Sequence, residues 1–209
     1  YRKEEKYLCQ QLELSEEKFF LLQMAIELFS TSVTTLFYRD QEGKDIYLRN
    51  LHVDRKDLGS LLCRVQLFRQ NRFVGYATLL AGSIGFLEGY SHHHKMILAV
   101  QRRPTPSHRW QLHTLFWHYL RGYRPSTFLL RSLLEEEEER DDTEIRDTLQ
   151  QTPILGEVYF ILIHTRDACV IQRTYSQLVM GVRHKTARCR FFPKNPERTV
   201  CFLTKDWYF

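Results

Sequence analysis

Residues 157–175 read EVYFILIHTRDACVIQRTY, and this stretch decides the fold class. Its first arm, 157–164, consists almost entirely of β-branched and aromatic residues, which favour strands. The residues TRDA (165–168) separate it from a second arm at 169–175, so the pattern predicts a strand–turn–strand hairpin. We therefore expect the chain to contain a β-sheet.

Other strands are predicted on both sides of this hairpin. MILAV (96–100) is a short, continuous apolar run, as expected of a strand that is buried on both faces. VTTLFYRDQEGKDIYL (33–48) is typical of two short strands around a turn at 40–44. The last segment, 182–209, is expected to add one or two edge strands.

Three main helices are expected around the sheet. Ser15, with Glu16 and Glu17 after it, is a good helix start, and this helix should end near 30–32. A second helix is expected from Asp54, with one apolar stripe formed by Leu58, Leu61, Leu62, Val65 and Phe68. A third should run from Ser107 to Arg121 and stop at Gly122, with a buried side of Leu112, Leu115, Phe116, Tyr119 and Leu120. The glycine-rich stretch 73–90 is expected to hold a short helix at 75–80 and then a tight loop.

These elements predict an α/β (α+β) fold, with a mixed β-sheet of about five or six strands packed by about three helices. The sequence divides into a helical and hairpin region (1–72), an α/β core (73–182) and a basic C-terminal segment (183–209). The core is expected to carry an acidic insertion at 131–152, since residues 135–147 read EEEEERDDTEIRD; this run is expected to be a solvated insertion or an exposed helical extension.

Cysteine content and hydropathy limit the cellular compartments in which the protein is expected. The five cysteines are odd in number and include no CxxC pair, so we expect reduced thiols rather than a disulfide framework or a zinc knuckle. This indicates an intracellular protein of the mitochondrial matrix or nucleus, with the cytoplasm as a further alternative. No apolar run approaches the roughly 18 residues that a membrane-spanning helix needs, so no membrane partner is expected.

Basic residues give the clearest partner signal. The chain has a net charge of +5, and cations recur every two or three residues between Arg183 and Arg198, beside two phenylalanines. Cations next to aromatic faces suit phosphates and unstacked bases, so RNA is the expected partner, together with other subunits of a large complex. An ordinary cationic surface and an acidic protein partner are the alternatives. The candidate RNA-binding residues are Arg102, Arg103, Arg109, Arg183, Lys185, Arg188, Arg190, Phe191, Phe192, Lys194 and Arg198.

Histidines invite a metal interpretation, but their spacing argues against it. His108, His113 and His118 are five residues apart, which on a helix places neighbours about 140° apart. No carboxylate or cysteine completes a ligand set beside His92, His93 and His94. We therefore expect no metal and no cofactor, and the common nucleotide-binding and hydrolase motifs are absent from the sequence.

The order of elements from 12 to 180 resembles subunits of the tRNA-splicing endonuclease family. The similar segments are LELSEEKFFLLQMAIEL, FVGYATLLAG, SHHHKMILAV and VYFILIHTRDACVIQRTY. Catalytic subunits of that family use a Tyr, a His and a Lys, and the resemblance implies an endonuclease-like C-terminal region. His92 or His93 matches the His position and Tyr90 is the candidate for the Tyr, but Arg121 and Gly122 stand where the Lys is expected. The resemblance therefore implies a non-catalytic partner rather than a cutting subunit.

Three functions remain open from the sequence. The first is a non-catalytic RNA-binding or scaffolding subunit of a ribonucleoprotein, such as an organellar ribosome, or of an RNA-processing complex. The second is an RNA endonuclease subunit that uses His92 or His93. The third is a protein-interaction module that binds no RNA.

Overall fold

The computed structural model describes residues 2–28, 31–39, 45–53, 59–102, 116–136, 140–164, 167–173, 178–184 and 200–203. Within these ranges the strands form two sheets, and every ladder between neighbouring strands is antiparallel. The α+β class is confirmed, but the expected single mixed sheet of five or six strands is replaced by antiparallel sheets of seven and three strands.

The seven-stranded sheet has the order β3-β4-β5-β6-β7-β8-β9. Its strands are β3 (Leu62–Arg69), β4 (Arg72–Leu80), β5 (Glu88–Ser91), β6 (Met96–Arg102), β7 (Val158–His164), β8 (Asp167–Arg173) and β9 (Leu178–His184). The three-stranded sheet has the order β10-β1-β2, with β1 (Thr31–Arg39), β2 (Asp45–Val53) and β10 (Val200–Leu203). The predicted hairpins at 33–48 and 157–175 and the predicted strand at 96–100 are confirmed, as are edge strands from the C-terminal part of the chain.

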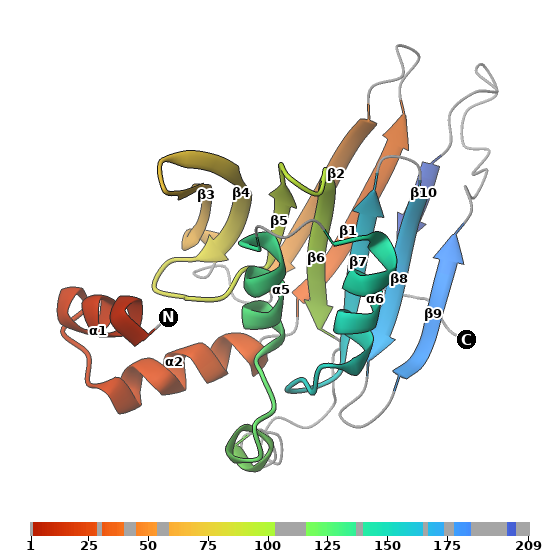
Figure 1. Cartoon of the computed structure of the whole chain (residues 1–209). Coiled ribbons are helices and arrows are strands. Elements are labelled where there is room, and N and C mark those ends of the chain that lie inside the picture. Colours follow the sequence, from red (N-terminus) through yellow and green to blue (C-terminus); the bar gives the residue numbers. More distant parts are fainter. Residues whose placement is uncertain are drawn as a thin grey trace.

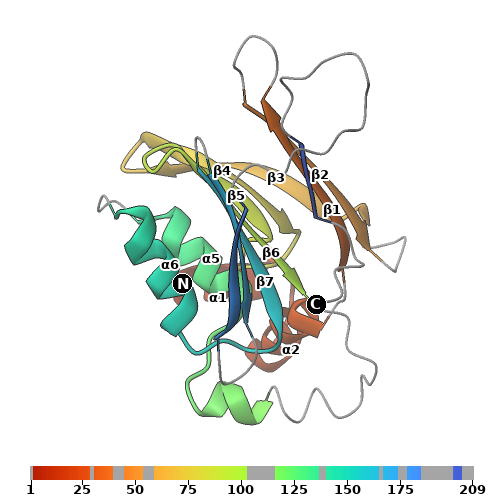
Figure 2. The ribbon, with the colours of Figure 1, turned by 90° about the vertical axis from the view of Figure 1, so that its right-hand side faces the viewer.

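The described helices are α1 (Arg2–Gln11), α2 (Glu16–Leu28), α5 (Ser126–Leu134) and α6 (Asp142–Gln151), with a further helical end at 116–120. Helices α5 and α6 cover one face of the seven-stranded sheet and the three-stranded sheet lies over the other (Figures 1 and 2). The result is a layered α–β–β arrangement, with α1 and α2 at one end.

Strand β6 shows how the sequence produces these layers. Met96, Leu98 and Val100 face α5 and α6 in the main core, whereas Ala99 lies in a smaller apolar cluster on the opposite face. Successive side chains of a strand point to opposite faces, so a strand between two layers has to be apolar at nearly every position. The prediction of burial on both faces is confirmed.

The helix predicted from Asp54 is wrong for the residues that the structure describes. Residues 62–69 form β3, in which Arg64 and Gln66 are exposed while Val65 and Leu67 are partly buried. The leucines fit a helical stripe by spacing, but the alternation of polar and apolar residues from 64 to 67 has the period of a strand. Residues 54–58 lie outside the described residues.

The short helix predicted at 75–80 is also wrong, because these residues belong to β4. Gly75 sits where β4 and β5 approach closely, and a Cβ there would stand 1.9 Å from the backbone oxygen of Tyr90. The glycine therefore permits strand contact rather than a tight loop. The expected boundary between 72 and 73 falls at the start of this strand, inside the β3–β4 hairpin.

The predicted third helix is described only at its C-terminal end. Gly122 has φ +84°, and the N–H groups of Gly122 and Tyr123 donate to the carbonyls of Tyr119 and His118. This is the glycine stop that the sequence predicts. The buried side is wrong where it can be examined, because Phe116, Tyr119 and Leu120 are exposed; Ser107, Leu112 and Leu115 lie outside the described residues.

The acidic stretch differs from the expected solvated insertion. Asp141 caps α6 by accepting a hydrogen bond from the Glu144 N–H at 2.7 Å, and acids in the first turn suit the positive end of the helix dipole. Ile145 and Leu149 of α6 are buried in the main core, as is Leu133 of α5. Part of the acidic run thus starts a helix that covers the sheet.

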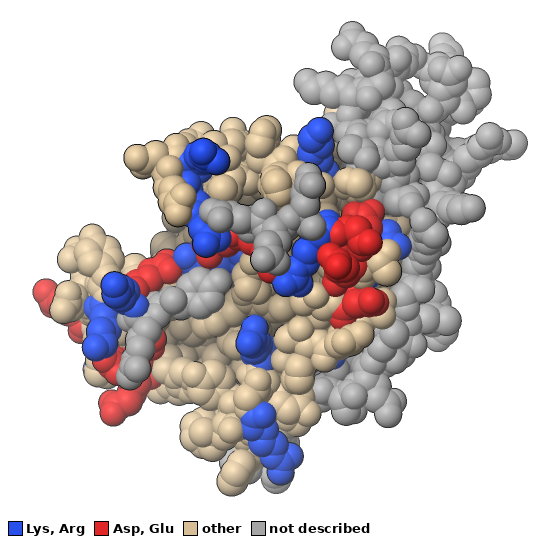
Figure 3. Space-filling model, viewed as in Figure 1, with Lys and Arg blue, Asp and Glu red and all other residues tan. Residues whose placement is uncertain are grey.

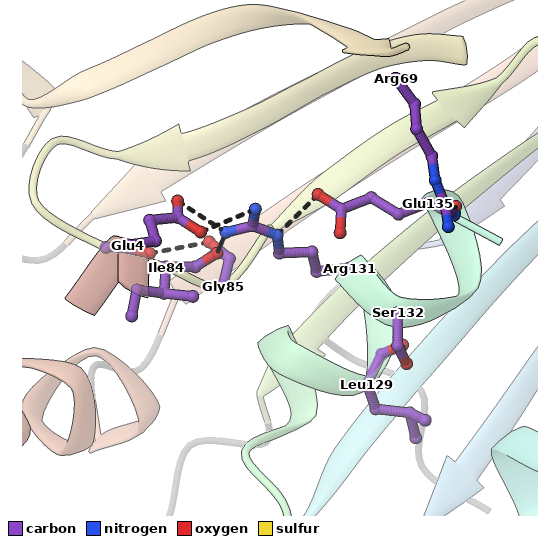
Figure 4. Close-up of polar contacts among 9 residues, drawn as sticks. Glu4, Arg69, Ile84, Gly85, Leu129, Arg131, Ser132 and Glu135 are labelled. Atoms are coloured by element: carbon purple, nitrogen blue, oxygen red, sulfur yellow. Dashed lines mark hydrogen bonds and ion pairs between the residues drawn. The ribbon is translucent and has the colours of Figure 1, made fainter. Parts of the chain in front are cut away.

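Helices α1 and α2 are held to the rest of the molecule by polar contacts. The buried Gln23 side chain donates to the Gly82 carbonyl at 2.9 Å and accepts from the Ile84 N–H at 2.8 Å. Arg131 of α5 bridges Glu4 of α1, Glu135 and the Ile84 carbonyl (Figure 4). The side chains of Gln23 and Arg131 both bind the loop 81–87, and this loop therefore joins helices α1 and α2 to the sheet.

Candidate functional site

A cluster of polar side chains lies between the two sheets. We call Tyr47, Arg49, Thr78 and Glu88 the polar centre; the first two lie in β2, Thr78 in β4 and Glu88 in β5. Tyr47 and Arg49 are two residues apart and so share one face of β2. Thr78 and Glu88 are directly paired across β4 and β5. The three-stranded and seven-stranded sheets thus each contribute two of the four residues.

Arg49 is almost fully buried, with only 3% of its side chain exposed. Its Nη1 donates to Glu88 Oε2 at 3.0 Å and to the Leu87 carbonyl at 3.1 Å, and its Nη2 donates to the Val100 carbonyl at 2.7 Å. A buried cation is tolerated when a carboxylate and further acceptors compensate for lost hydration. Arg49 therefore fastens β2 to β5 and β6.

Glu88 receives donors from all three other members of the centre. Its Oε2 accepts from Arg49 and from the Tyr47 hydroxyl at 3.1 Å, and its Oε1 accepts from the Thr78 hydroxyl at 2.9 Å. Glu88 thus lies at the middle of the polar centre, where it forms an ion pair with Arg49.

Tyr47 stays a neutral hydrogen-bond donor in this environment. Burial raises the pKa of its hydroxyl above the ordinary value, Arg49 opposes that shift, and Glu88 adds to it. Tyr47 also packs against the apolar cluster of Ala99, Ile161 and Ile163. An apolar surrounding strengthens each electrostatic interaction of the centre because the local dielectric constant is low.

One donor of the polar centre has no acceptor. The Arg49 Nε atom is buried without a hydrogen-bond partner. A buried charged N–H that lacks an acceptor is costly, at about 1–3 kcal/mol or more, and such groups call for an explanation. Arg49 Nε is therefore the donor of the centre whose hydrogen-bonding capacity is unused.

The structure brings the sequence-predicted residues Tyr90, His92 and His93 together at the end of β5 and the turn that follows. The rings of Tyr90 and His92 are 6.4 Å apart, and His92 also lies 5.6 Å from the Phe73 ring. His93 is exposed and stacks edge-on against the buried His94 at 5.1 Å. A catalytic role for these residues stays a prediction.

Most of the predicted RNA-binding residues lie outside the described residues. Arg102 is the last residue of β6 and Arg183 lies in β9. The positions beyond the described part of the chain are Arg103, Arg109, Lys185, Arg188, Arg190, Phe191, Phe192, Lys194 and Arg198. RNA binding by this set stays a prediction.

The polar centre was not predicted from the sequence. Arg49 and Glu88 are separated by 39 residues and lie in different sheets, so no local spacing connects them. The available signal was a single charged residue inside each of two strand-like stretches, IYLRNLHV and GFLEGYS. A charge at such a position needs a buried partner, but the sequence does not say which.

Among the described residues, no group of three or more His, Cys, Asp or Glu side chains is arranged to hold a metal ion. Within the same ranges Cys9 and Cys63 are free thiols. None of the helices in this part of the chain combines the length and apolarity needed to cross a membrane.

Comparisons with known proteins give a likeness in fold. No protein family matches this chain, and no curated protein matches its sequence. Among solved structures, the Caenorhabditis elegans N-acylethanolamine-hydrolyzing acid amidase (NAAA) ortholog matches with a TM-score of 0.61 and 19% identity, over 80% of this chain and 68% of that one. Nothing in these comparisons tests the resemblance to tRNA-splicing endonuclease subunits. The described architecture is therefore similar to that of an amide-hydrolysing enzyme, and at this identity the similarity concerns the fold alone.

Proposed function

We propose that this chain binds a lipid amide of the N-acylethanolamine class, with the amide group at the polar centre. The single observation that carries the proposal is the buried Arg49 Nε–H without an acceptor; Arg146 and Arg173 also have such an Nε, but only Arg49 lies in the polar centre, paired with Glu88. An amide carbonyl oxygen supplies such an acceptor, and a charge-assisted hydrogen bond of this kind is stronger than a neutral one. The likeness in fold to an acid amidase supports the choice of an amide over other carbonyl compounds.

The surroundings of the centre support a ligand with a hydrocarbon part. Ala99, Ile161 and Ile163 form the buried apolar cluster that adjoins Tyr47. Glu88 already neutralises Arg49 at 3.0 Å, so an anionic ligand such as a free fatty acid would add a second negative charge beside the carboxylate. A neutral amide fits this charge balance better than a carboxylate does.

Hydrolysis of the bound amide would need a nucleophile and a group that accepts its proton. The sequence STSVTT at 30–35 is rich in hydroxyl groups, and the strand β1 that contains most of it pairs with β2, with Thr35 opposite Arg49. These hydroxyls are the first candidates for a nucleophile. Binding and hydrolysis are separate parts of the proposal.

Calorimetric titration of the purified chain with a long-chain N-acylethanolamine tests the binding part. We expect saturable binding, weaker binding of the matching free fatty acid, and a loss of about tenfold or more in Arg49→Gln, since a charge-assisted hydrogen bond contributes about 1.5–3 kcal/mol. Arg64→Gln, at an exposed position of β3, is the matched control and should bind normally. If the wild-type chain does not bind the amide, the proposal fails whether or not the Arg49 variant folds.

Release of ethanolamine from the same ligand tests the hydrolysis part. Production of ethanolamine by the wild-type chain, and its loss in Thr31→Ala or Thr35→Ala, would support a β1 nucleophile. Binding without release would restrict the function to ligand binding.

RNA binding is a second candidate, favoured by the basic C-terminal segment. The sequence from Arg183 to Arg198 contains six basic residues and one acidic residue, Glu197. We propose a non-catalytic RNA-binding or scaffolding role for this segment, in which counterion release drives association. The affinity for structured RNA should then fall steeply as salt is raised, and a flat salt response would count against the role. RNA cleavage that is lost in a His92→Ala/His93→Ala double variant would instead favour an endonuclease subunit.

A further inference from the structure

The helical end at 116–120 and the residues after it carry exposed apolar and aromatic side chains. We call Phe116–Arg124 the aromatic projection. Phe116, Trp117, Tyr119 and Leu120 are each 41–57% exposed. Single exposed hydrophobic residues are ordinary, but four within five consecutive residues form a contiguous patch that indicates a contact surface.

The charged residues of the aromatic projection are cations. From Gln101 to Leu134 the sequence contains no Asp and no Glu, whereas it contains six arginines. Arg121 and Arg124, within the projection, are exposed. Figure 3 shows blue and tan but no red at the lower end of the molecule, where Figure 1 places this helical end. An apolar surface that carries exposed cations is complementary to a negatively charged partner with an apolar interior.

The projection is held in place by the fold behind it. Tyr119 packs its ring 4.7 Å from the Phe20 ring of α2, and Tyr123 packs 4.6 Å from the His118 ring. The Arg124 backbone donates to the Pro153 carbonyl at 2.9 Å and accepts from the Leu155 N–H at 2.8 Å. The exposed side chains are therefore presented from an ordered support that both ribbon views place beyond the ends of the sheet strands (Figures 1 and 2).

We propose that the aromatic projection docks the protein onto an anionic membrane surface, without spanning it. Trp and Tyr favour the interface between lipid headgroups and acyl chains, and Leu120 and Phe116 would lie in the apolar part of that interface. Arg121 and Arg124 would remain at the level of the anionic headgroups, where each basic residue strengthens binding. Such contact at the surface requires no membrane-spanning helix, and the described residues contain none.

The composition of the projection favours a membrane over a nucleic acid. Leu120 is its most exposed apolar residue, at 57%, and an aliphatic side chain offers no ring for base stacking. Burial of Leu120 and Phe116 in lipid gains the free energy of removing apolar surface from water. The arginines could bind either an anionic membrane or a nucleic acid. The exposed apolar residues therefore distinguish the two partners, and they favour the membrane.

Flotation with vesicles tests the proposal in the absence of any lipid-amide ligand, so its outcome is independent of the proposed function. The full chain is mixed with phosphatidylcholine vesicles that either contain or lack phosphatidylserine. We expect flotation with the anionic vesicles that weakens as salt is raised. Trp117→Ser/Leu120→Ser should reduce partitioning about tenfold or more, and Arg121→Gln/Arg124→Gln should reduce it about tenfold.

The matched control is Phe68→Ser, which removes an aromatic side chain that is 60% exposed on β3, away from the projection. This variant should float like the wild type. A wild type that ignores anionic vesicles, or a Trp117→Ser/Leu120→Ser variant that floats like the Phe68→Ser control, would overturn the proposal. Flotation that single-stranded RNA abolishes equally in the wild type and in the Trp117→Ser/Leu120→Ser variant would assign the surface to RNA instead.

Discussion

Arg131 in α5 lies 2.9 Å from Glu4 in α1, although 127 residues separate them in the sequence. Glu135, one helical turn after Arg131, binds the same guanidinium at 2.8 Å. The Arg131 guanidinium also lies over the Phe86 ring at 5.0 Å and donates to the Ile84 carbonyl. Arg131 thus links the N-terminal helix to the core, in addition to the apolar packing of Cys9 against Phe19 and Ile84.

Replacing Arg131 with Met should lower the free energy of unfolding by about 2–4 kcal/mol, because the Ile84 carbonyl and two carboxylates lose their donor. Glu4→Gln should cost less than about 1 kcal/mol, because Glu4 is partly exposed and its ion pair is screened by water. Urea denaturation measures both changes, and hydrogen exchange over 5–11 reports whether α1 detaches. Glu5→Gln, on the same helix, is the control; equal effects of Glu4→Gln and Arg131→Met would contradict this account.

At the polar centre, Arg49→Met should lower the free energy of unfolding by about 3–5 kcal/mol, because it leaves the Glu88 carboxylate without its cation. Adding Glu88→Gln in the Arg49→Met background should recover part of this loss, since the uncompensated charge is removed. A double-mutant cycle by denaturant unfolding measures the coupling between the two residues. Additive single effects would show that the pair at 3.0 Å contributes no interaction of its own.

Alkaline pH should destabilise the protein partly through Tyr47. Because burial raises the pKa of Tyr47 in the folded state, the unfolded chain ionises first, above its ordinary pKa of about 10. The stabilising contribution is complete below that pH and is lost as pH rises towards the folded pKa, at about 1.4 kcal/mol per pH unit for one proton.

Tyr47→Phe should therefore give a shallower fall in the free energy of unfolding above pH 10 than the wild type. The exposed Tyr7 provides the control, and Tyr7→Phe should leave the slope unchanged. Identical slopes for the wild type and Tyr47→Phe would show that Tyr47 ionises equally in both states.

Gly75→Ala should destabilise the protein by about 3 kcal/mol, because the new Cβ would meet a backbone oxygen that cannot move without breaking the ladder between β4 and β5. Gly59→Ala is the matched control, since a Cβ at Gly59 meets no atom within 4 Å. Thermal unfolding of both variants measures the difference. A Gly75→Ala variant as stable as Gly59→Ala would contradict the close approach of these two strands.

The sequence was most informative where one local pattern had one structural solution. The apolar runs at 96–100 and 157–164 could only be strands between layers, and Gly122 ended its helix as predicted. Residues 62–69 were misassigned because the leucines and Phe68 also fit a helical stripe, whereas Arg64 and Gln66 lie on the exposed face of β3 and Val65 and Leu67 on the partly buried face. Helix propensity and strand alternation are weak compared with tertiary context.

The polar centre could not be predicted from the sequence, for a different reason. Arg49 and Glu88 meet only when β2 is laid across β5, and the packing of two sheets is not encoded in any local spacing. Likewise, the apolar residues at 116–120 were expected to be buried because their periodicity is that of a core-facing helix. Periodicity identifies an apolar face but not what covers it.

The pairing of β1 with β10 has a consequence for how the chain acquires its structure. Thr35 lies opposite Leu203, so this ladder joins residues that are far apart in the sequence. During synthesis one edge of the β1–β2 hairpin stays open until residues 200–203 have left the ribosome. Such distant contacts slow folding and prolong the exposure of unpaired strands, so completion of the three-stranded sheet is expected to be a late event at which chaperones have the longest opportunity to act.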